Sequence, residues 1–210
     1  MSLGTAVASF AVVATVLTLT PGLDTALVLR AALTQGRRDA AATASGIVAG
    51  LLVWGAAAAV GVSALLTASE LAFDLLRYAG AAYLVWFGAR LILRAVRPRK
   101  ADALPDTAPS RTAWRAARLG LLTNLLNPKV GVFYVALLPQ FLPAGSDPLG
   151  VGLLLAGVHG SLSLLWFALL IVLADALGRW LRRPRTTRAI DGVTGAALVG
   201  FGIRLATAGR

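Results

Sequence analysis

The chain has 210 residues, of which 58% are hydrophobic and only 14% are charged, and its mean hydropathy is +0.78. A soluble domain carries about 25% charged residues, and a soluble fold of this length could not hide so much apolar surface from water. The composition therefore excludes a soluble enzyme or binding domain and predicts an all-α polytopic membrane protein.

The excess of positive charge, a net +11, is typical of arginines in membrane loops that face anionic lipid headgroups. Nucleic acid is not an expected partner, because no basic stretch lies on a soluble module. The chain has no cysteine and a single histidine, His159. This argues against thiol chemistry and against a zinc or other metal site, and no cofactor is expected.

Six apolar stretches follow one another, each close to the roughly 20 residues that cross a bilayer. They cover residues 4–29, 40–69, 71–93, 119–141, 149–174 and 190–208. The first stretch has no basic signal-peptide region before it, so we expect it to remain as a membrane span. The third and sixth are the weakest predictions, because they are short or carry charges near their ends.

Lysine and arginine alternate between the segments that join these spans. Those after spans one, three and five are strongly basic, whereas only Arg77 and Arg210 lie on the other side. The positive-inside rule then places the basic segments in the cytoplasm and both termini outside. Trp114 and Trp180 lie beside the basic segments, as interfacial anchors do. The basic segments hold Arg37, Arg38, Arg94, Arg97, Arg99, Lys100, Arg111, Arg115, Arg118, Arg179, Arg182, Arg183, Arg185 and Arg188.

The two halves of the chain share a pattern. Each opens with a span broken at a proline, Pro21 in the first half and Pro128 in the second. Each closes with a Gly-Ala-Ala helix, which begins at Gly80 or at Gly195. Because each half holds three spans, an odd number, the two halves would cross the membrane in opposite senses.

The sequence thus predicts two inverted three-helix repeats, residues 1–95 and 116–210, joined by a cytoplasmic linker of residues 96–115. Inverted repeats with broken helices in matching positions are typical of secondary transporters, whose binding site lies near the bilayer midplane.

Both breaks are predicted as helix starts. Thr20 and Asn127 are residue types that cap helix N-termini, and Pro21 and Pro128 would then occupy the first helical position. Each half-helix would point unpaired N–H groups and a partial positive charge into the protein, where carboxylates bind readily.

Asp24 and Lys129 lie in the first turns of these half-helices. A charge at the bilayer centre costs about 2.5–3.5 kcal/mol, so each residue is expected to face a cavity or a partner. One interpretation is an ion pair between them that holds the halves together. The other is that Asp24 receives a substrate ammonium while Lys129 and the half-helix N–H groups receive a carboxylate, which suits an amino acid.

His159 lies in the fifth span. It could carry a coupling proton, because histidine titrates near neutrality, or it could simply be hydrogen-bonded within the bundle. Glycines in the spans are expected at close helix contacts. These are Gly46, Gly50, Gly80, Gly88, Gly152, Gly195 and Gly202.

Several of these motifs resemble the LysE-type translocators, specifically their RhtB branch, over nearly the whole chain and in the right order. One departure is Leu23, where the family usually has a second proline. The motifs are Thr20-Pro21-Gly22-Leu23-Asp24-Thr25 followed by Gly36, Gly80-Ala81-Ala82-Tyr83-Leu84 with Trp86 and Gly88, Gly120-Leu121-Leu122-Thr123-Asn124-Leu125-Leu126-Asn127-Pro128-Lys129, Phe133, and Leu138-Pro139-Gln140-Phe141.

The resemblance implies export of basic amino acids, homoserine, threonine or small neutral relatives, driven by proton exchange, across a bacterial inner membrane. The candidates for proton coupling are Asp24 and His159. The candidates for substrate binding are Thr20, Pro21, Gly22, Asp24, Asn124, Asn127, Pro128 and Lys129.

The leading hypothesis is therefore a secondary amino-acid exporter, with membrane lipid and a small molecule as partners and a homo-oligomer as an open alternative. A cation or metal exporter of a related six-span fold has few ligands, since the spans offer one deep acidic residue, one histidine and no cysteine. A membrane-embedded hydrolase would need a second deep aspartate, or an acid to orient His159 beside Ser161 or Ser163. We do not expect an enzyme.

Overall fold

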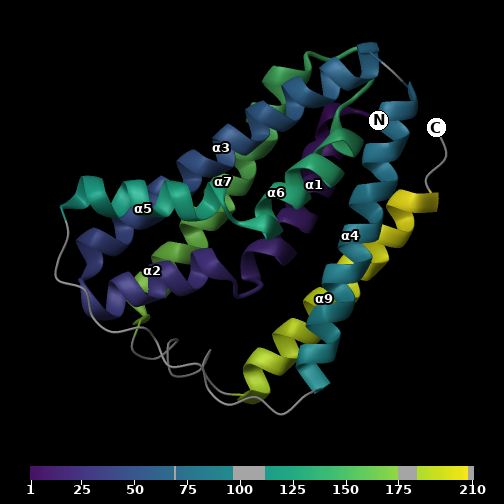
Figure 1. Cartoon of the computed structure of the whole chain (residues 1–210). Coiled ribbons are helices and arrows are strands. Elements are labelled where there is room, and N and C mark those ends of the chain that lie inside the picture. Colours follow the sequence, from purple (N-terminus) through teal and green to yellow (C-terminus); the bar gives the residue numbers. More distant parts are fainter. Residues whose placement is uncertain (69, 97–111, 175–183, 208–210) are drawn as a thin grey trace.

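A computed structural model describes residues 1–68, 70–96, 112–174 and 184–207, and these residues are almost entirely helical (Figure 1). The predicted all-α class is confirmed. The elements are α1 (Leu3–Leu19), α2 (Leu23–Thr34), α3 (Arg37–Ala68), α4 (Glu70–Val96), α5 (Ala113–Leu125), α6 (Pro128–Leu137), the 3-10 helix η1 (Leu138–Phe141), α7 (Pro148–Val172) and α9 (Pro184–Thr207).

Length and composition support two membrane spans within the described residues, or up to four if each bent helix pair crosses as one span. The helices α3 and α7 each contain 25 residues that are apolar enough to cross a membrane, Arg37–Gly61 and Pro148–Val172. The bent pairs α1–α2 and α5–α6 would each count as one more span, and each pair is bent by 55° at its break.

The helices α4 and α9 form where the third and sixth spans are predicted. Within the described residues, neither meets the same test of length and hydropathy, although 84–93 of α4 form a shorter apolar stretch. The sequence gives the reason, because Arg90 and Arg204 interrupt the apolar runs of the two helices. Most of the predicted linker 96–115, and Trp180 with the basic residues of 175–183, lie outside the described residues.

The break between α5 and α6 follows the predicted chemistry. Asn127 is the N-cap of α6, and its side-chain oxygen accepts a hydrogen bond of 3.1 Å from the backbone N–H of Lys129. Pro128 occupies the first turn, where its missing N–H removes no helical hydrogen bond.

The predicted capping at the first break is wrong. Thr20 is the C-cap of α1, not the N-cap of α2. Its hydroxyl donates 2.7 Å to the carbonyl of Val16, so it is used by the helix that precedes it. Pro21 therefore lies between the helices, and Gly22 is the N-cap of α2 with no side chain to cap it.

Two sets of long helices pack through glycines. Along α3, which lies against α5 and α7, a Cβ atom at Gly46 would overlap the backbone of Ala117. Where α4 packs along α9, a Cβ atom at Gly88 would lie 2.6 Å from the carbonyl oxygen of Gly195, and the reverse also holds. Close contacts are confirmed in this way for Gly46, Gly50, Gly88, Gly152, Gly195 and Gly202.

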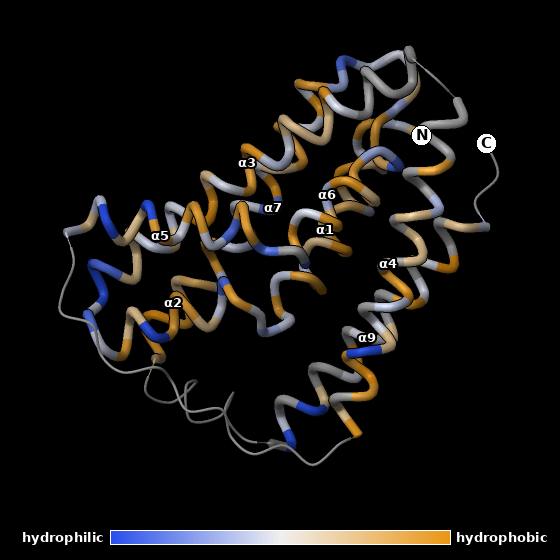
Figure 2. Tube along the Cα trace, in the orientation of Figure 1, coloured by the Kyte–Doolittle hydropathy of each residue, from blue (hydrophilic) through white to orange (hydrophobic). Residues whose placement is uncertain are grey.

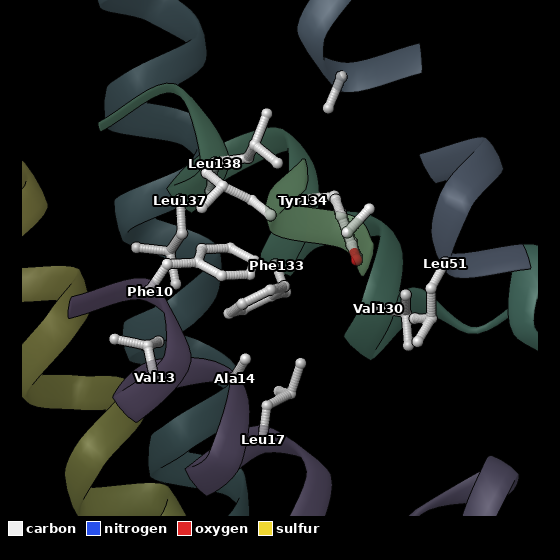
Figure 3. Packing of buried hydrophobic residues seen from close by; sticks show 14 of the residues in the cluster. Phe10, Val13, Ala14, Leu17, Leu51, Val130, Phe133, Tyr134, Leu137 and Leu138 are labelled. Carbon is white, nitrogen blue, oxygen red and sulfur yellow. The ribbon is translucent and has the colours of Figure 1, made fainter. Parts of the chain in front are cut away.

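The main core joins α1 to α6. Figure 3 shows Phe10 and Leu17 of α1 facing Phe133 and Leu137 of α6, and the rings of Phe10 and Phe133 lie 5.6 Å apart. Many large apolar side chains instead face outward, Leu165 at 71% exposure among them. Figure 2 shows hydrophobic colour along most of the helices and hydrophilic residues near the ends of α5 and α9. Such an exterior suits lipid.

Candidate functional site

The two breaks meet around a small buried cavity. Asp24 in the first turn of α2 and Lys129 in the first turn of α6 both line it. Its volume of about 20 Å³ is room for about one water molecule and is too small for an amino acid in this conformation. The lining residues are Leu17, Thr18, Gly22, Asp24, Thr25, Ile47, Leu51, Lys129, Val130, His159, Ser163 and Phe167.

Lys129 supplies a hydrogen bond that Pro21 removes. In a continuous helix the carbonyl of Leu17 would accept from the backbone N–H four residues on, but that residue is proline and has none. The Nζ atom of Lys129 donates to this carbonyl at 3.0 Å and to the carbonyl of Thr20 at 3.0 Å. The ammonium therefore satisfies the frayed end of α1, where the helix dipole is negative.

At the second break, too, a side chain donates to a carbonyl that has lost its helical partner. Four residues before Pro128 lies Asn124, whose backbone carbonyl also loses its helical donor. It accepts instead from the N–H of Asn127 at 3.0 Å and from the indole N–H of Trp54, on α3, at 3.4 Å. Each break thus takes a side-chain donor from a helix on the other side of the chain's midpoint.

Asp24 is held by an amide. The Nδ2 atom of Asn124, which is fully buried, donates to one oxygen of the Asp24 carboxylate at 2.9 Å. The other oxygen of Asp24, the side-chain oxygen of Asn124 and the Nδ2 atom of Asn127 are buried without a hydrogen-bond partner. Three orphaned polar atoms at one place are costly in a protein interior, and a polar substrate could satisfy them.

Asp24 and Lys129 influence each other electrostatically, but they are not in direct contact. Lys129 donates to two carbonyls of α1, whereas Asp24 accepts from Asn124 and also interacts with the side chain of Asn127. Neither charge is therefore neutralised by a direct bond to the other.

His159 lines the cavity from α7 and is 3% exposed. Its Nδ1 atom shares a hydrogen bond of 3.1 Å with the hydroxyl of Tyr134, and the two rings are stacked at 5.8 Å. The rings of Phe10 and Phe133 pack edge-on against it. The histidine is thus fixed in orientation beside the two charged residues.

The structure gathers most of the residues that the sequence singled out. Gly22, Asp24, Lys129 and His159 line one cavity, and Asn124 touches it through Asp24. The remaining candidates shape the breaks: the carbonyl of Thr20 binds Lys129, the side chain of Asn127 caps α6, and Pro21 and Pro128 lie at the breaks.

Sequence reasoning missed Trp54, Tyr134 and Thr18. An indole N–H in the middle of an uncharged span was a signal for Trp54, because every donor in that setting needs an acceptor. Thr18 lies 3.5 Å from Ser163, oxygen to oxygen. Of the serines considered for a hydrolase, Ser161 is exposed and bonds to its own helix, the carbonyl of Gly157.

Within the described residues, no three histidine, cysteine, aspartate or glutamate side chains come together where they could hold a metal ion.

Comparison with known proteins gives the same family from independent matches. The family described as LysE type translocator matches residues 15–209. The chain is 30% identical to an uncharacterized membrane protein, YrhP, of Bacillus subtilis, over 91% of this chain and 94% of that one. It is 29% identical to a homoserine/homoserine lactone efflux protein of Salmonella typhi, over 95% of each chain. It is 29% identical to a leucine efflux protein of an Enterobacter species, over 90% of this chain and 89% of the relative. No solved structure matches the chain significantly.

Proposed function

The chain belongs to the LysE type translocator family, and from that premise we propose that it exports small neutral or basic amino acids across a bacterial inner membrane in exchange for protons. The family places it among multi-pass membrane efflux transporters and not among enzymes. The relatives named for efflux of homoserine, homoserine lactone and leucine support a substrate built on an amino-acid backbone.

The observation that carries the proposal is that two opposite charges, not in contact with each other, line one small cavity. Asp24 has a carboxylate oxygen without a hydrogen-bond partner, and Lys129 brings an ammonium to the same cavity. An α-amino acid carries the complementary pair. Its ammonium would go to Asp24, and its carboxylate to Lys129 and the uncapped N-terminus of α2 behind Gly22.

Six spans in two inverted repeats are the architecture we propose for this transporter. The broken pairs α1–α2 and α5–α6 correspond to each other, as do α3 with α7 and α4 with α9. The equal bends of 55° support this. The α4–α9 contact supports it as well. Gly195 of the second Gly-Ala-Ala motif contacts Gly88 of α4, and Ala81 of the first motif contacts Gly202 of α9, so the two helices make matching contacts in opposite directions.

The orientation we propose has both termini outside. In Figure 1, the α2–α3 turn and the described ends that lead into 97–111 and 175–183 lie toward the left and lower side of the bundle. The segments rich in arginine would therefore share one face of the membrane, the cytoplasmic one.

Proton exchange is the coupling we propose, with Asp24 and His159 as the carriers. Both line the cavity, so a proton on either would be exchanged at the same place as the substrate. No specific observation favours a metal exporter or a hydrolase over this function.

The test is flux in proteoliposomes with an imposed pH gradient, using labelled leucine, homoserine and lysine. We expect the protein to move at least one of them, faster with the gradient than without it. Asp24→Asn and Lys129→Gln should each abolish the flux, whereas Asp106→Asn and Lys100→Gln, the same changes in the polar segment between the halves, should leave it intact. Normal flux in both cavity variants would refute the proposed site.

A further inference from the structure

The carbonyl groups of Leu17 and Thr20 form an ammonium cradle, by which we mean these two oxygens and the space above Gly22. The Nζ atom of Lys129 lies 3.0 Å from each oxygen. An ammonium group has three N–H donors and no acceptor, so the cradle uses two of them. The cradle lies at the C-terminal end of α1, where unsatisfied carbonyls and the helix dipole favour a cation.

Gly22 keeps the cradle open. A Cβ atom there would lie 3.2 Å from Nζ of Lys129, a tight contact that would move the ammonium by a few tenths of an ångström. Since the φ angle of Gly22 is −152°, its backbone conformation is open to other residues. The lack of a side chain matters here for space and not for conformation.

Pro21 leaves the carbonyl of Leu17 without a backbone donor, so that Lys129 can bind it. Any other residue at this position would offer an N–H to the carbonyl of Leu17 and continue α1 by one hydrogen bond. The break therefore leaves the carbonyl of Leu17 to a side-chain donor, and Leu17, Asp24 and Lys129 all line the same cavity.

The group that occupies this cradle is chemically the same as the α-ammonium of an amino acid. From this geometry we infer that the carbonyls of Leu17 and Thr20 are the substrate-ammonium site, that the Lys129 ammonium occupies it in the empty carrier, and that the substrate displaces it. Lys129 then turns to the substrate carboxylate, and Asp24 faces the incoming ammonium. The inference rests on the proposed function, because it requires a substrate with both groups.

The binding of Lys129 to the cradle stabilises the carrier when no substrate is bound. Without Lys129, the carbonyl of Leu17 would lose the donor that replaces the missing N–H of Pro21, and an unsatisfied carbonyl is costly in a membrane interior. An amine that lacks a carboxylate would displace the Lys129 ammonium without offering it a new hydrogen-bond acceptor. The cradle therefore selects for ligands that carry both charges.

The experiment is chemical rescue of Lys129→Ala, followed by thermal unfolding in detergent. Methylammonium should fit the emptied cradle and raise the melting temperature by about 3–6 °C at ten times its Kd. Tetramethylammonium, which has the same charge and no N–H, should give no such rise, and neither should sodium chloride at the same ionic strength. The protein with Lys129 intact should show no difference between the two amines.

Equal responses to methylammonium and tetramethylammonium in Lys129→Ala would overturn the inference. If that variant cannot be purified with or without methylammonium, Pro21→Ala decides the matter. The new N–H would compete for the carbonyl of Leu17, and we expect amino-acid affinity to fall at least about tenfold. Unchanged affinity in Pro21→Ala would overturn the cradle as well.

The two proposals fail separately. Rescue by methylammonium in a protein that moves no amino acid would leave the cradle standing and refute the proposed function. Amino-acid flux in the unaltered protein, without specific rescue of Lys129→Ala by methylammonium, would support the proposed function and refute the cradle.

Discussion

A methyl group added at Gly50 should disable Asp24 without changing any polar residue. A Cβ atom at Gly50 would lie 2.5 Å from the side-chain oxygen of Asn124, 2.9 Å from its Cβ and 3.0 Å from its Cγ. A carbon and an oxygen in contact are about 3.3 Å apart, so the amide must retreat by about 0.8 Å. Because three of its atoms are crowded, rotation of the amide alone cannot relieve the contact.

A retreat of that size directed away from Asp24 would lengthen the hydrogen bond from Asn124 to Asp24, now 2.9 Å, to about 3.7 Å, which is no longer a hydrogen bond. A hydrogen bond to a charged group contributes about 1.5–3 kcal/mol. If Asp24 binds substrate in its charged and oriented form, the affinity for substrate should fall about 10- to 150-fold.

Equilibrium binding of the amino acid that gives the highest flux measures this effect for Gly50→Ala. The control is Gly61→Ala on the same helix, where a Cβ atom would meet nothing within 4 Å. We expect Gly61→Ala to bind as the unaltered protein does. Wild-type affinity in a folded Gly50→Ala protein would show that the amide does not set the state of Asp24, and the reasoning would fail.

Three further substitutions test the packing by thermal unfolding. Gly195→Ala should lower the melting temperature by about 2–12 °C, since its Cβ would lie 2.6 Å from a carbonyl oxygen of α4. The control is Gly200→Ala on the same helix, which has open space around it and should be neutral or slightly stabilising. Equal effects of the two substitutions would refute the close contact between α4 and α9. Trp54→Phe keeps a ring but removes the N–H at the second break, and should cost about 0.5–1.5 kcal/mol; no loss would mean that the 3.4 Å contact contributes nothing. Tyr134→Phe leaves the Nδ1 atom of His159 buried without its 3.1 Å partner and should cost about 1–3 kcal/mol, whereas an unchanged melting temperature would show that a water replaces the hydroxyl.

The sequence was sufficient to predict the helix cap at the second break but not at the first. An asparagine followed by proline can cap only the helix that the proline begins, and the structure has that cap at Asn127. At the first break, Thr20 had two local choices, to cap α2 or to bond back to Val16. The structure has the second, and nothing in the sequence near Thr20 decides between them.

The sequence could not predict which way the buried side chains point in α7, the most apolar helix. α7 is apolar on every side, so its periodicity does not reveal that His159 faces the cavity. The role of Trp54 depends on contact with a residue 70 positions away. Such contacts follow from helix packing, which a single sequence does not specify.

The exchange of donors between the two breaks also has a consequence for how the chain is made. The carbonyl of Asn124 meets Trp54, which is synthesised 70 residues earlier and can already be in the membrane when the second break emerges. The carbonyl of Leu17 has to wait for Lys129, 112 residues later. The first helix to leave the ribosome is thus among the last to be completed, and a fragment that stops before Lys129 should insert with its first span still unfinished.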